Sequence, residues 1–173
     1  MIFTGFKRNS NQLFFKRRLP ELLKNSAKYS SQRITRILIF LDDFSDKKAI
    51  NENLYKLLNM PVGTIEILVY HTKVEKNKNV EDRISSADFG WYGKIKSEKL
   101  KIILTKKYDL LINYSKVDNI YINLLILQCK AAFRVGFSHL DNRFYDLIIN
   151  CESSNFLLFN EEIKKYLQIL KKI

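Results

Sequence analysis

The sequence predicts a three-layer α/β domain with a mostly parallel sheet, preceded by a basic helical arm. Short, almost wholly apolar runs alternate with longer amphipathic segments, as in parallel sheets that are covered on both faces. In residues 108–137 a strand, a helix and a strand follow one another, and such a crossover normally makes its two strands parallel. Positive charge is concentrated before this alternating pattern begins.

The predicted arm covers residues 1–35, and the α/β domain covers residues 36–173. The 173 residues include 30 Lys and Arg and 18 Asp and Glu, so the net charge is +12. Residues 1–36 contribute +8 of this charge and the rest of the chain contributes +4. A basic arm on a nearly neutral body is typical of contact with an anionic polymer or a membrane surface. The basic residues expected to bind RNA or another anion are Lys7, Arg8, Lys16, Arg17, Arg18, Lys24, Lys28 and Arg33.

The arm should be helical. Leu19-Pro20-Glu21 suits a helix start, because proline is tolerated in the first turn, so we expect one or two short helices. Apolar residues flank the triplet Lys16-Arg17-Arg18 and must be buried against something. Two interpretations are open. Either the arm docks on RNA or lipid headgroups, or it packs on its own domain and leaves its basic face in solvent.

In the first half of the domain, a strand over 36–43 precedes a helix over 46–58 and a second strand over 64–70. Residues 71–84 are charged and poor in apolar side chains, which predicts a solvated, mobile loop. Another helix is expected over 97–107.

In the second half, the apolar residues of the helix over 118–130 are too dense for a one-sided helix, so it should be largely buried. Asp118 and Asn119 are candidate capping residues for its start. The pattern Tyr-Asp-Leu, two aliphatic residues and Asn occurs twice, which indicates two similar buried strands. Strands are predicted over 109–113, 131–137 and 144–150, and a last helix over 159–173.

The stretch Asp88 to Lys94 contains three aromatic residues and two glycines. Exposed aromatic rings of this kind can stack on a base or contact a protein. The simpler reading is an edge strand or loop whose rings cover the core. Phe89, Trp91 and Tyr92 are therefore candidates for a partner surface.

Polar residues follow two of the predicted strands. Asp42 and Asp43 end the first strand and Asn113 ends the strand of the central unit. Ligands of open α/β sheets bind beyond the carboxyl ends of the strands, so these three residues are candidates for a cleft. Asp and Ser after a strand also cap helices, which is the alternative role.

No Gly-rich phosphate loop follows a strand, and His71 and His139 fall in different loops. Cys129 and Cys151 lack metal-ligand spacing and are expected to be reduced core thiols. We therefore expect no metal and no cofactor, and we lean against an enzyme. No apolar run approaches the roughly 20 residues that span a bilayer, and the start does not resemble a signal peptide, so a cytoplasmic location is expected.

Four segments of the chain carry a resemblance to a known family: 86–94, 109–114, 130–137 and 143–149. They resemble a family of small uncharacterised α/β proteins found in Bacteroidota, and this resemblance implies a fold and a lineage but no catalytic residues.

A more distant similarity is carried by Tyr108-Asp109-Leu110, the following helix and residues 133–137. These segments resemble the N-terminal, Rossmann-like domain of the lipopolysaccharide heptosyltransferases. In that family the nucleotide-sugar donor sits mainly in a second domain. The Gly-rich first turn is here replaced by Asp42-Asp43-Phe44-Ser45. The similarity thus implies a Rossmann-like half without the donor machinery.

The expected function is that of a non-enzymatic accessory protein whose arm binds an anionic partner. The first expected partner is RNA or a ribosomal particle, the second is an anionic membrane surface, and the third is a protein. The rival expectation is a degenerate or partner-dependent glycosyltransferase-like protein, which would bind a nucleotide or sugar at the cleft of Asp42, Asp43 and Asn113.

Overall fold

The computed structural model describes residues 2–25, 33–72 and 83–173. A six-stranded sheet with the order β3-β2-β1-β5-β7-β8 forms its centre, and every neighbouring pair is parallel. This order, in which the chain builds outward on both sides of β1, is that of a Rossmann-like sheet and confirms the predicted fold class. The strands are β1 (Ile37–Asp42), β2 (Ile65–His71), β3 (Arg83–Ser85), β5 (Leu110–Asn113), β7 (Arg134–Phe137) and β8 (Leu147–Ile149).

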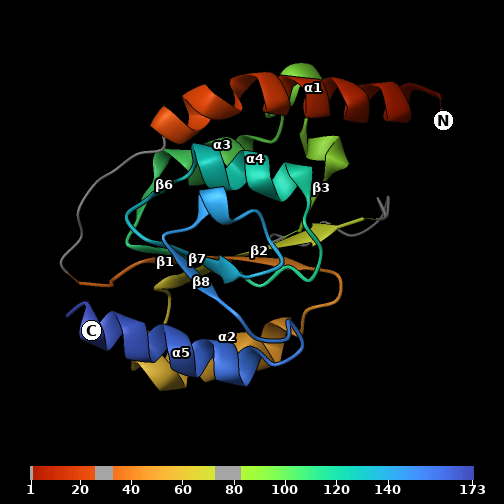
Figure 1. Cartoon of the computed structure of the whole chain (residues 1–173). Coiled ribbons are helices and arrows are strands. Elements are labelled where there is room, and N and C mark those ends of the chain that lie inside the picture. Colours follow the sequence, from red (N-terminus) through yellow and green to blue (C-terminus); the bar gives the residue numbers. More distant parts are fainter. Residues whose placement is uncertain (1, 26–32, 73–82) are drawn as a thin grey trace.

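Helices cover both faces of the sheet (Figure 1). One face carries α2 (Lys47–Leu58) and α5 (Phe156–Ile169), and the other carries α3 (Glu98–Thr105) and α4 (Ile120–Gln128). A further helix, α1 (Ile2–Asn25), lies outside α4 and forms an additional layer. The shorter elements are β4 (Lys107–Tyr108) paired with β6 (Lys130–Ala131), and the 3-10 turns η1 (Ser86–Asp88), η2 (Trp91–Gly93) and η3 (Asn142–Phe144).

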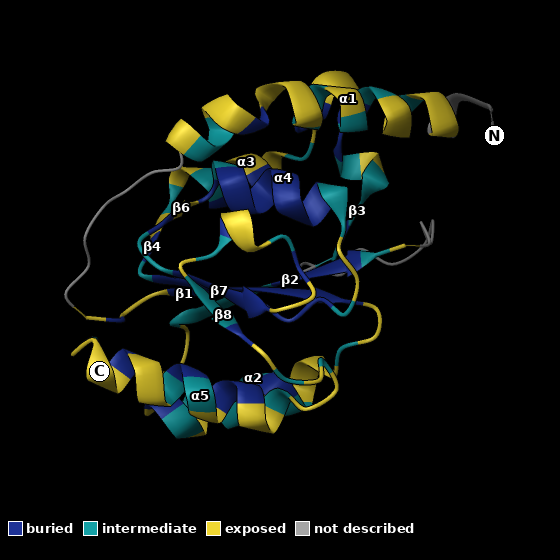
Figure 2. Cartoon of the chain, viewed as in Figure 1, coloured by how far each residue is buried: buried dark blue, intermediate teal, exposed yellow. Residues whose placement is uncertain are grey.

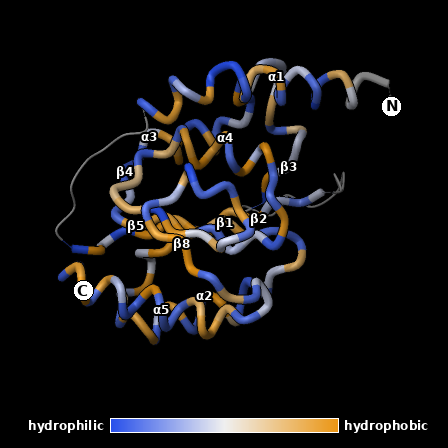
Figure 3. Tube along the Cα trace, in the orientation of Figure 1, coloured by the Kyte–Doolittle hydropathy of each residue, from blue (hydrophilic) through white to orange (hydrophobic). Residues whose placement is uncertain are grey.

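Helix α4 is buried nearly all round, as its apolar density predicts. Its residues 121–127 are all buried (Figure 2), and Asn119 caps its start by accepting a hydrogen bond from the Tyr121 N–H. The sheet covers one side of α4 and α1 covers the other. Figure 3 shows that α4 is mostly hydrophobic, whereas α1 alternates between hydrophobic and hydrophilic positions.

The N-terminal arm packs on its own domain, so the structure answers the question that the sequence left open. Leu19 is buried, and four partly buried side chains pack on the same core as α4. They are Phe14, Phe15, Leu22 and Leu23.

The expectation of short helices starting near Pro20 was wrong, because α1 is one helix of 24 residues with Pro20 inside it. Proline removes a backbone hydrogen bond from a helix interior. Apolar contacts on both sides of Pro20 hold the helix together despite that loss, since tertiary packing supplies most helical stability in proteins.

The repeated Tyr-Asp-Leu pattern has a structural explanation. Asp109 accepts hydrogen bonds from the backbone N–H groups of Thr35 and Arg36, at 2.8 and 2.9 Å, just before β1. Asp146 accepts a bond from the Arg134 N–H, at 2.8 Å, where β7 begins. Each aspartate thus precedes its own strand and fixes the start of the neighbouring strand.

Several predicted boundaries differ from the structure. The predicted strand over 131–137 is divided, because residues 130–131 pair with β4 and the sheet strand starts at Arg134. Phe144 lies in η3 rather than in the last strand, and α5 starts three residues earlier than the predicted helix. The predicted loop over 71–84 falls largely on residues 73–82, which are outside the described residues, and its end forms the edge strand β3.

Candidate functional site

Residues 89–93, here called the aromatic corner, connect the sheet edge to α1. Phe89 is fully buried against Tyr121, with ring centroids 4.8 Å apart. It is therefore not part of an exposed partner surface, and its assignment to one is corrected. Trp91 and Tyr92 do reach solvent, with exposed fractions of 45% and 67%.

Glycine is required at position 93, where the aromatic corner meets α1. Gly93 has a φ of +70°, and a Cβ built there would lie 2.5 Å from the Phe14 ring. Its N–H donates a 2.8 Å hydrogen bond to Oδ1 of the fully buried Asn11. The N–H of Tyr92 donates to the Ser10 hydroxyl at 3.4 Å. The aromatic corner and α1 are thus joined by both polar and apolar contacts.

Lys7 belongs to this junction and is not a free cation. Its Nζ donates a 2.8 Å hydrogen bond to the carbonyl of Ser86. Partial burial and the nearby Lys96 lower the pKa of Lys7, while Asp88 opposes them. Lys94 and Lys96 are exposed beside the aromatic corner, so basic side chains flank its two exposed rings.

The other predicted anion-binding residues divide into separate groups. Arg18 is paired with Glu21 at 2.5 Å and lies over the Phe14 ring. Arg33 is exposed and has other interactions, and Lys28 lies outside the described residues. Arg17 and Lys24 are exposed on the outside of α1, whereas Arg8 and Lys16 line a pocket.

The exposed side of α1 carries a stripe that we call the outer stripe: Phe6, Leu13, Arg17 and Lys24. Their spacing of seven, four and seven residues places them on one side of a helix with 3.6 residues per turn. Phe6 and Leu13 are 61% and 50% exposed. Ser10, which contacts Tyr92, lies one turn from Leu13, so the aromatic corner adjoins the outer stripe.

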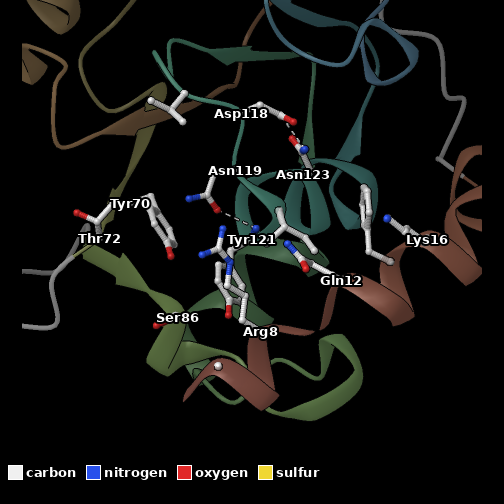
Figure 4. A pocket seen from close by; sticks show the side chains of 14 residues that line it. Arg8, Gln12, Lys16, Tyr70, Thr72, Ser86, Asp118, Asn119, Tyr121 and Asn123 are labelled. Atoms are coloured by element: carbon white, nitrogen blue, oxygen red, sulfur yellow. Dashed lines mark hydrogen bonds between the residues drawn. The ribbon is translucent and has the colours of Figure 1, made fainter. Parts of the chain in front are cut away.

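A pocket of about 730 Å³ lies under the other flank of α1, and we call it the α1–α4 pocket (Figure 4). One wall is the row Arg8, Gln12 and Lys16 of α1, together with Gly5 and Phe15. The opposite wall is the start of α4 and the turn before it, over residues 117–121, with Asn123 behind them. Tyr70 and Thr72, at the carboxyl end of β2, and Ser86 close the remaining side.

The pocket combines two cations with neutral polar groups. Across the described ranges, neither Arg8 nor Lys16 forms an ion pair. The one carboxylate in the lining, Asp118, accepts a 2.8 Å hydrogen bond from Nδ2 of Asn123. Burial raises the pKa of Tyr70 to about 12, so its hydroxyl keeps its proton at neutral pH.

The predicted cleft residues Asp42 and Asn113 end the neighbouring strands β1 and β5, where Asn113 pairs with Phe40, but neither residue lines the pocket. Asp42 is buried, and its carboxylate accepts bonds from the N–H of Phe44 at 3.1 Å and of Lys116 at 2.6 Å. Asn113 receives a bond from the Ser115 N–H and donates one to the Tyr145 hydroxyl. These two side chains tie the loops together at the point where the strand order reverses.

Asp43 faces the other way, toward the end of β2. It accepts hydrogen bonds from the N–H and hydroxyl of Thr72, at 2.8 and 2.9 Å, and pairs with His71. Burial alone would raise the pKa of Asp43, but the Thr72 bonds and His71 outweigh it and the pKa is lowered. Neither Asp42 nor Asp43 caps α2; Asp46 does so through a bond from the Ala49 N–H.

Within residues 2–25, 33–72 and 83–173, no three His, Cys, Asp or Glu side chains gather closely enough to hold a metal ion. In the same part of the chain, no helix is both long and apolar enough to cross a bilayer. Cys129 and Cys151 are both free thiols, the first of them buried.

Sequence reasoning missed most of the pocket. Arg8 and Lys16 were predicted as anion-binding residues of the arm, and the structure places them on a cavity wall that the arm shares with the domain. Gln12, Tyr70 and Asn123 carried no signal by themselves. The spacing of Arg8, Gln12 and Lys16 by four residues is the one pattern that could have placed them in a row.

Comparison with known proteins identifies a family without assigning an activity. Residues 7–170 match the model of the "Family of unknown function (DUF6913)". No curated protein matches the chain significantly, and neither does any solved structure. Because the match begins within α1 and runs through the sheet to the end of α5, the family model includes most of the arm together with the domain. The chain therefore belongs to the family of unknown function DUF6913.

Proposed function

We propose that this protein is a non-enzymatic accessory protein of the cytoplasm that binds RNA, free or in a ribosomal particle. The binding surface is the outer stripe of α1 together with Trp91 and Tyr92 of the aromatic corner. The observation that carries the proposal is the juxtaposition of exposed cations and exposed aromatic rings on one side of a chain with a net charge of +12. The free thiols of Cys129 and Cys151 support a reducing compartment.

The two kinds of side chain have different tasks. Arg17 and Lys24 neutralise phosphates and release counterions, which makes binding dependent on salt. Trp91 and Tyr92 stack on unpaired bases, which adds affinity that depends little on salt. Since Phe6 and Leu13 are also exposed in the outer stripe, anionic lipid headgroups or a protein are the competing occupants.

The test measures binding of a fluorescent single-stranded RNA between 50 and 300 mM salt. Arg17→Gln with Lys24→Gln should lower the slope of log K against log salt by about 1.4, from roughly 0.7 for each phosphate contact. Trp91→Ala should weaken binding at every salt concentration and leave the slope unchanged. Lys48→Gln with Lys56→Gln is the control, because it removes the same charge from exposed positions of α2 on the opposite face of the sheet.

Two results would overturn the proposal. One is an equal loss of slope in the α1 and α2 variants, because net charge and not this surface would then explain binding. The other is binding to anionic vesicles without binding to RNA. Sedimentation of a lysate then tests the ribosomal particle, because co-migration should disappear at high salt and after RNase treatment.

The second proposal is a glycosyltransferase-like protein that binds a nucleotide or sugar at the carboxyl edge of the sheet. The Rossmann-like strand order supports it, since such folds bind ligands at that edge. We also propose that the chain is related to proteins of Bacteroidota and, more distantly, to the N-terminal domain of the heptosyltransferases, and the second of these relationships supports this function. Saturable binding of a nucleotide sugar that Asp43→Asn abolishes would favour this function, and its absence would remove it.

A further inference from the structure

We propose that the α1–α4 pocket binds a phosphorylated small molecule of nucleotide size, with Arg8 and Lys16 as its phosphate partners. This site is distinct from the outer stripe and does not depend on the RNA-binding proposal. It also differs from the cleft of Asp42, Asp43 and Asn113, because none of these residues lines it.

The location fits ligand binding in this fold. Ligands of open α/β sheets lie beyond the carboxyl ends of the strands, at the point where the strand order reverses. Here the buried Asp42 joins the loops after β1 and β5 through its bond from the Lys116 N–H. The α1–α4 pocket, with its open volume of about 730 Å³, lies beside these joined loops, over the end of β2 and the start of α4. It falls within the range of roughly 300–1,000 Å³ that is usual for small-molecule sites.

The cations of the pocket form an ordered row. Arg8, Gln12 and Lys16 are spaced four residues apart, so they follow one side of α1 over about 12 Å at 1.5 Å per residue. A phosphate beside Gln12 would lie about 6 Å along the helix axis from each of the two basic residues, a distance that the long Arg and Lys side chains can span. Figure 4 shows these three side chains extending from α1 among the residues that line the pocket. Because neither cation has an ion-pair partner across the described ranges, both remain available to an anion.

The rest of the lining suits the non-phosphate part of such a ligand. Phe15, Val117 and Ile120 offer apolar surface for a ring, and Val117 is 56% exposed. Asn123 is 4% exposed and lines the pocket, and its Oδ1 has no hydrogen-bond partner. A ligand hydroxyl or amino group would satisfy that buried acceptor, which is otherwise costly to leave unpaired. Asp118 disfavours a phosphate at the α4 end, which places the phosphate along the α1 row.

The experiment is isothermal titration of the full chain with AMP, GMP, CMP and UMP, and with the four nucleosides and inorganic phosphate as comparisons. At least one nucleotide should bind with a saturable isotherm and more tightly than its nucleoside. Arg8→Gln with Lys16→Gln should weaken this binding about 10-fold or more, as expected for loss of charge-assisted hydrogen bonds. Arg17→Gln with Lys24→Gln removes the same charge from the outer stripe of the same helix and should change binding less than about 2-fold.

A gain of binding separates this inference from simple misfolding. Gln12→Arg places a third cation in the middle of the row and should tighten nucleotide binding, which a damaged fold would not do. A 5′-phosphorylated RNA oligomer and its 5′-hydroxyl form tell a free nucleotide from an RNA end. If the phosphorylated oligomer binds through Arg8 and Lys16 while no free nucleotide does, the small-molecule inference is overturned and the pocket binds RNA ends instead.

Three further outcomes overturn the inference. They are nucleosides that bind as well as their phosphates, equal losses in the two double variants, and no binding of any phosphorylated probe at millimolar concentration. The RNA-binding proposal fails separately, since its slope test uses Arg17 and Lys24 and leaves the pocket intact.

Discussion

Replacing Gly93 with alanine tests whether α1 is an integral layer of this fold. Gly93 lies where the aromatic corner meets α1, with a φ of +70°. An L-residue in the left-handed region costs about 1–2 kcal/mol. The new Cβ would also lie 2.5 and 2.7 Å from two atoms of the Phe14 ring, and relieving such a contact costs a further 1–3 kcal/mol or so. We expect Gly93→Ala to lower the free energy of unfolding by about 2–5 kcal/mol.

Gly63→Ala is a matched control for the backbone term. Gly63 also has a positive φ, +88°, but nothing lies within 4 Å of a Cβ built there. Its replacement should therefore cost only the conformational part, about 1–2 kcal/mol. The difference between the two variants then measures the contact with Phe14. Phe14→Leu in the Gly93→Ala background should recover part of that difference, because a smaller side chain makes room for the methyl group.

The assay is urea unfolding followed by the fluorescence of Trp91, combined with hydrogen exchange of residues 5–24. If the cost exceeds the free energy that holds α1 in place, the helix will detach and its amides will exchange rapidly while the sheet stays protected. Equal destabilisation by Gly93→Ala and Gly63→Ala, with slow exchange in α1 for both, would refute the described packing.

Three further predictions concern single side chains. Asn11→Ala leaves the buried Gly93 N–H without its acceptor and should cost about 1–3 kcal/mol by urea unfolding, with the faster exchange again confined to α1. Because the folded state lowers the pKa of Asp43 below its ordinary value of 3.8, its ionised form stabilises the fold above that pH and the benefit disappears as the pH falls further. The stability difference between the wild type and Asp43→Asn should therefore be largest above about pH 5 and shrink below about pH 4. Burial raises the pKa of Cys129 to about 12, so a thiol reagent at pH 8 should modify Cys151 first and reach Cys129 only after unfolding.

Much of the fold was predictable because its signals are local. The strand of the central unit and the first core strand are wholly buried, and a buried parallel strand reads as a continuous apolar run. The start of α4 was predictable because Asn119 provides the expected capping acceptor. By contrast, β3 has only three residues and follows a charged segment, so its pairing with β2 left no pattern in the sequence.

The candidate site was less predictable because it depends on where α1 lies. Charge alone grouped Arg8 and Lys16 with Arg17 and Lys24, although the structure places the first pair on a flank of α1 and the second pair on its outside. The spacing of four residues predicts that Arg8, Gln12 and Lys16 lie in a row on one side of a helix. It does not predict which part of the domain that row faces. Asp42 and Asp43 were predicted as cleft residues because they follow β1. In the structure their carboxylates already accept hydrogen bonds from backbone N–H groups of nearby loops.

The apolar density of α4 links these observations. A crossover helix on an ordinary α/β sheet needs one apolar side, whereas α4 is buried over residues 121–127 and therefore requires a cover on its outer side. Helix α1 provides that cover with Phe14, Phe15 and Leu19, so its basic residues are displaced to its two flanks and its outside. One flank then closes the α1–α4 pocket and the outside forms the outer stripe. A variant that detaches α1 should thus remove nucleotide binding even when Arg8 and Lys16 are intact, whereas RNA affinity should persist in part because Arg17 and Lys24 stay exposed on the detached helix.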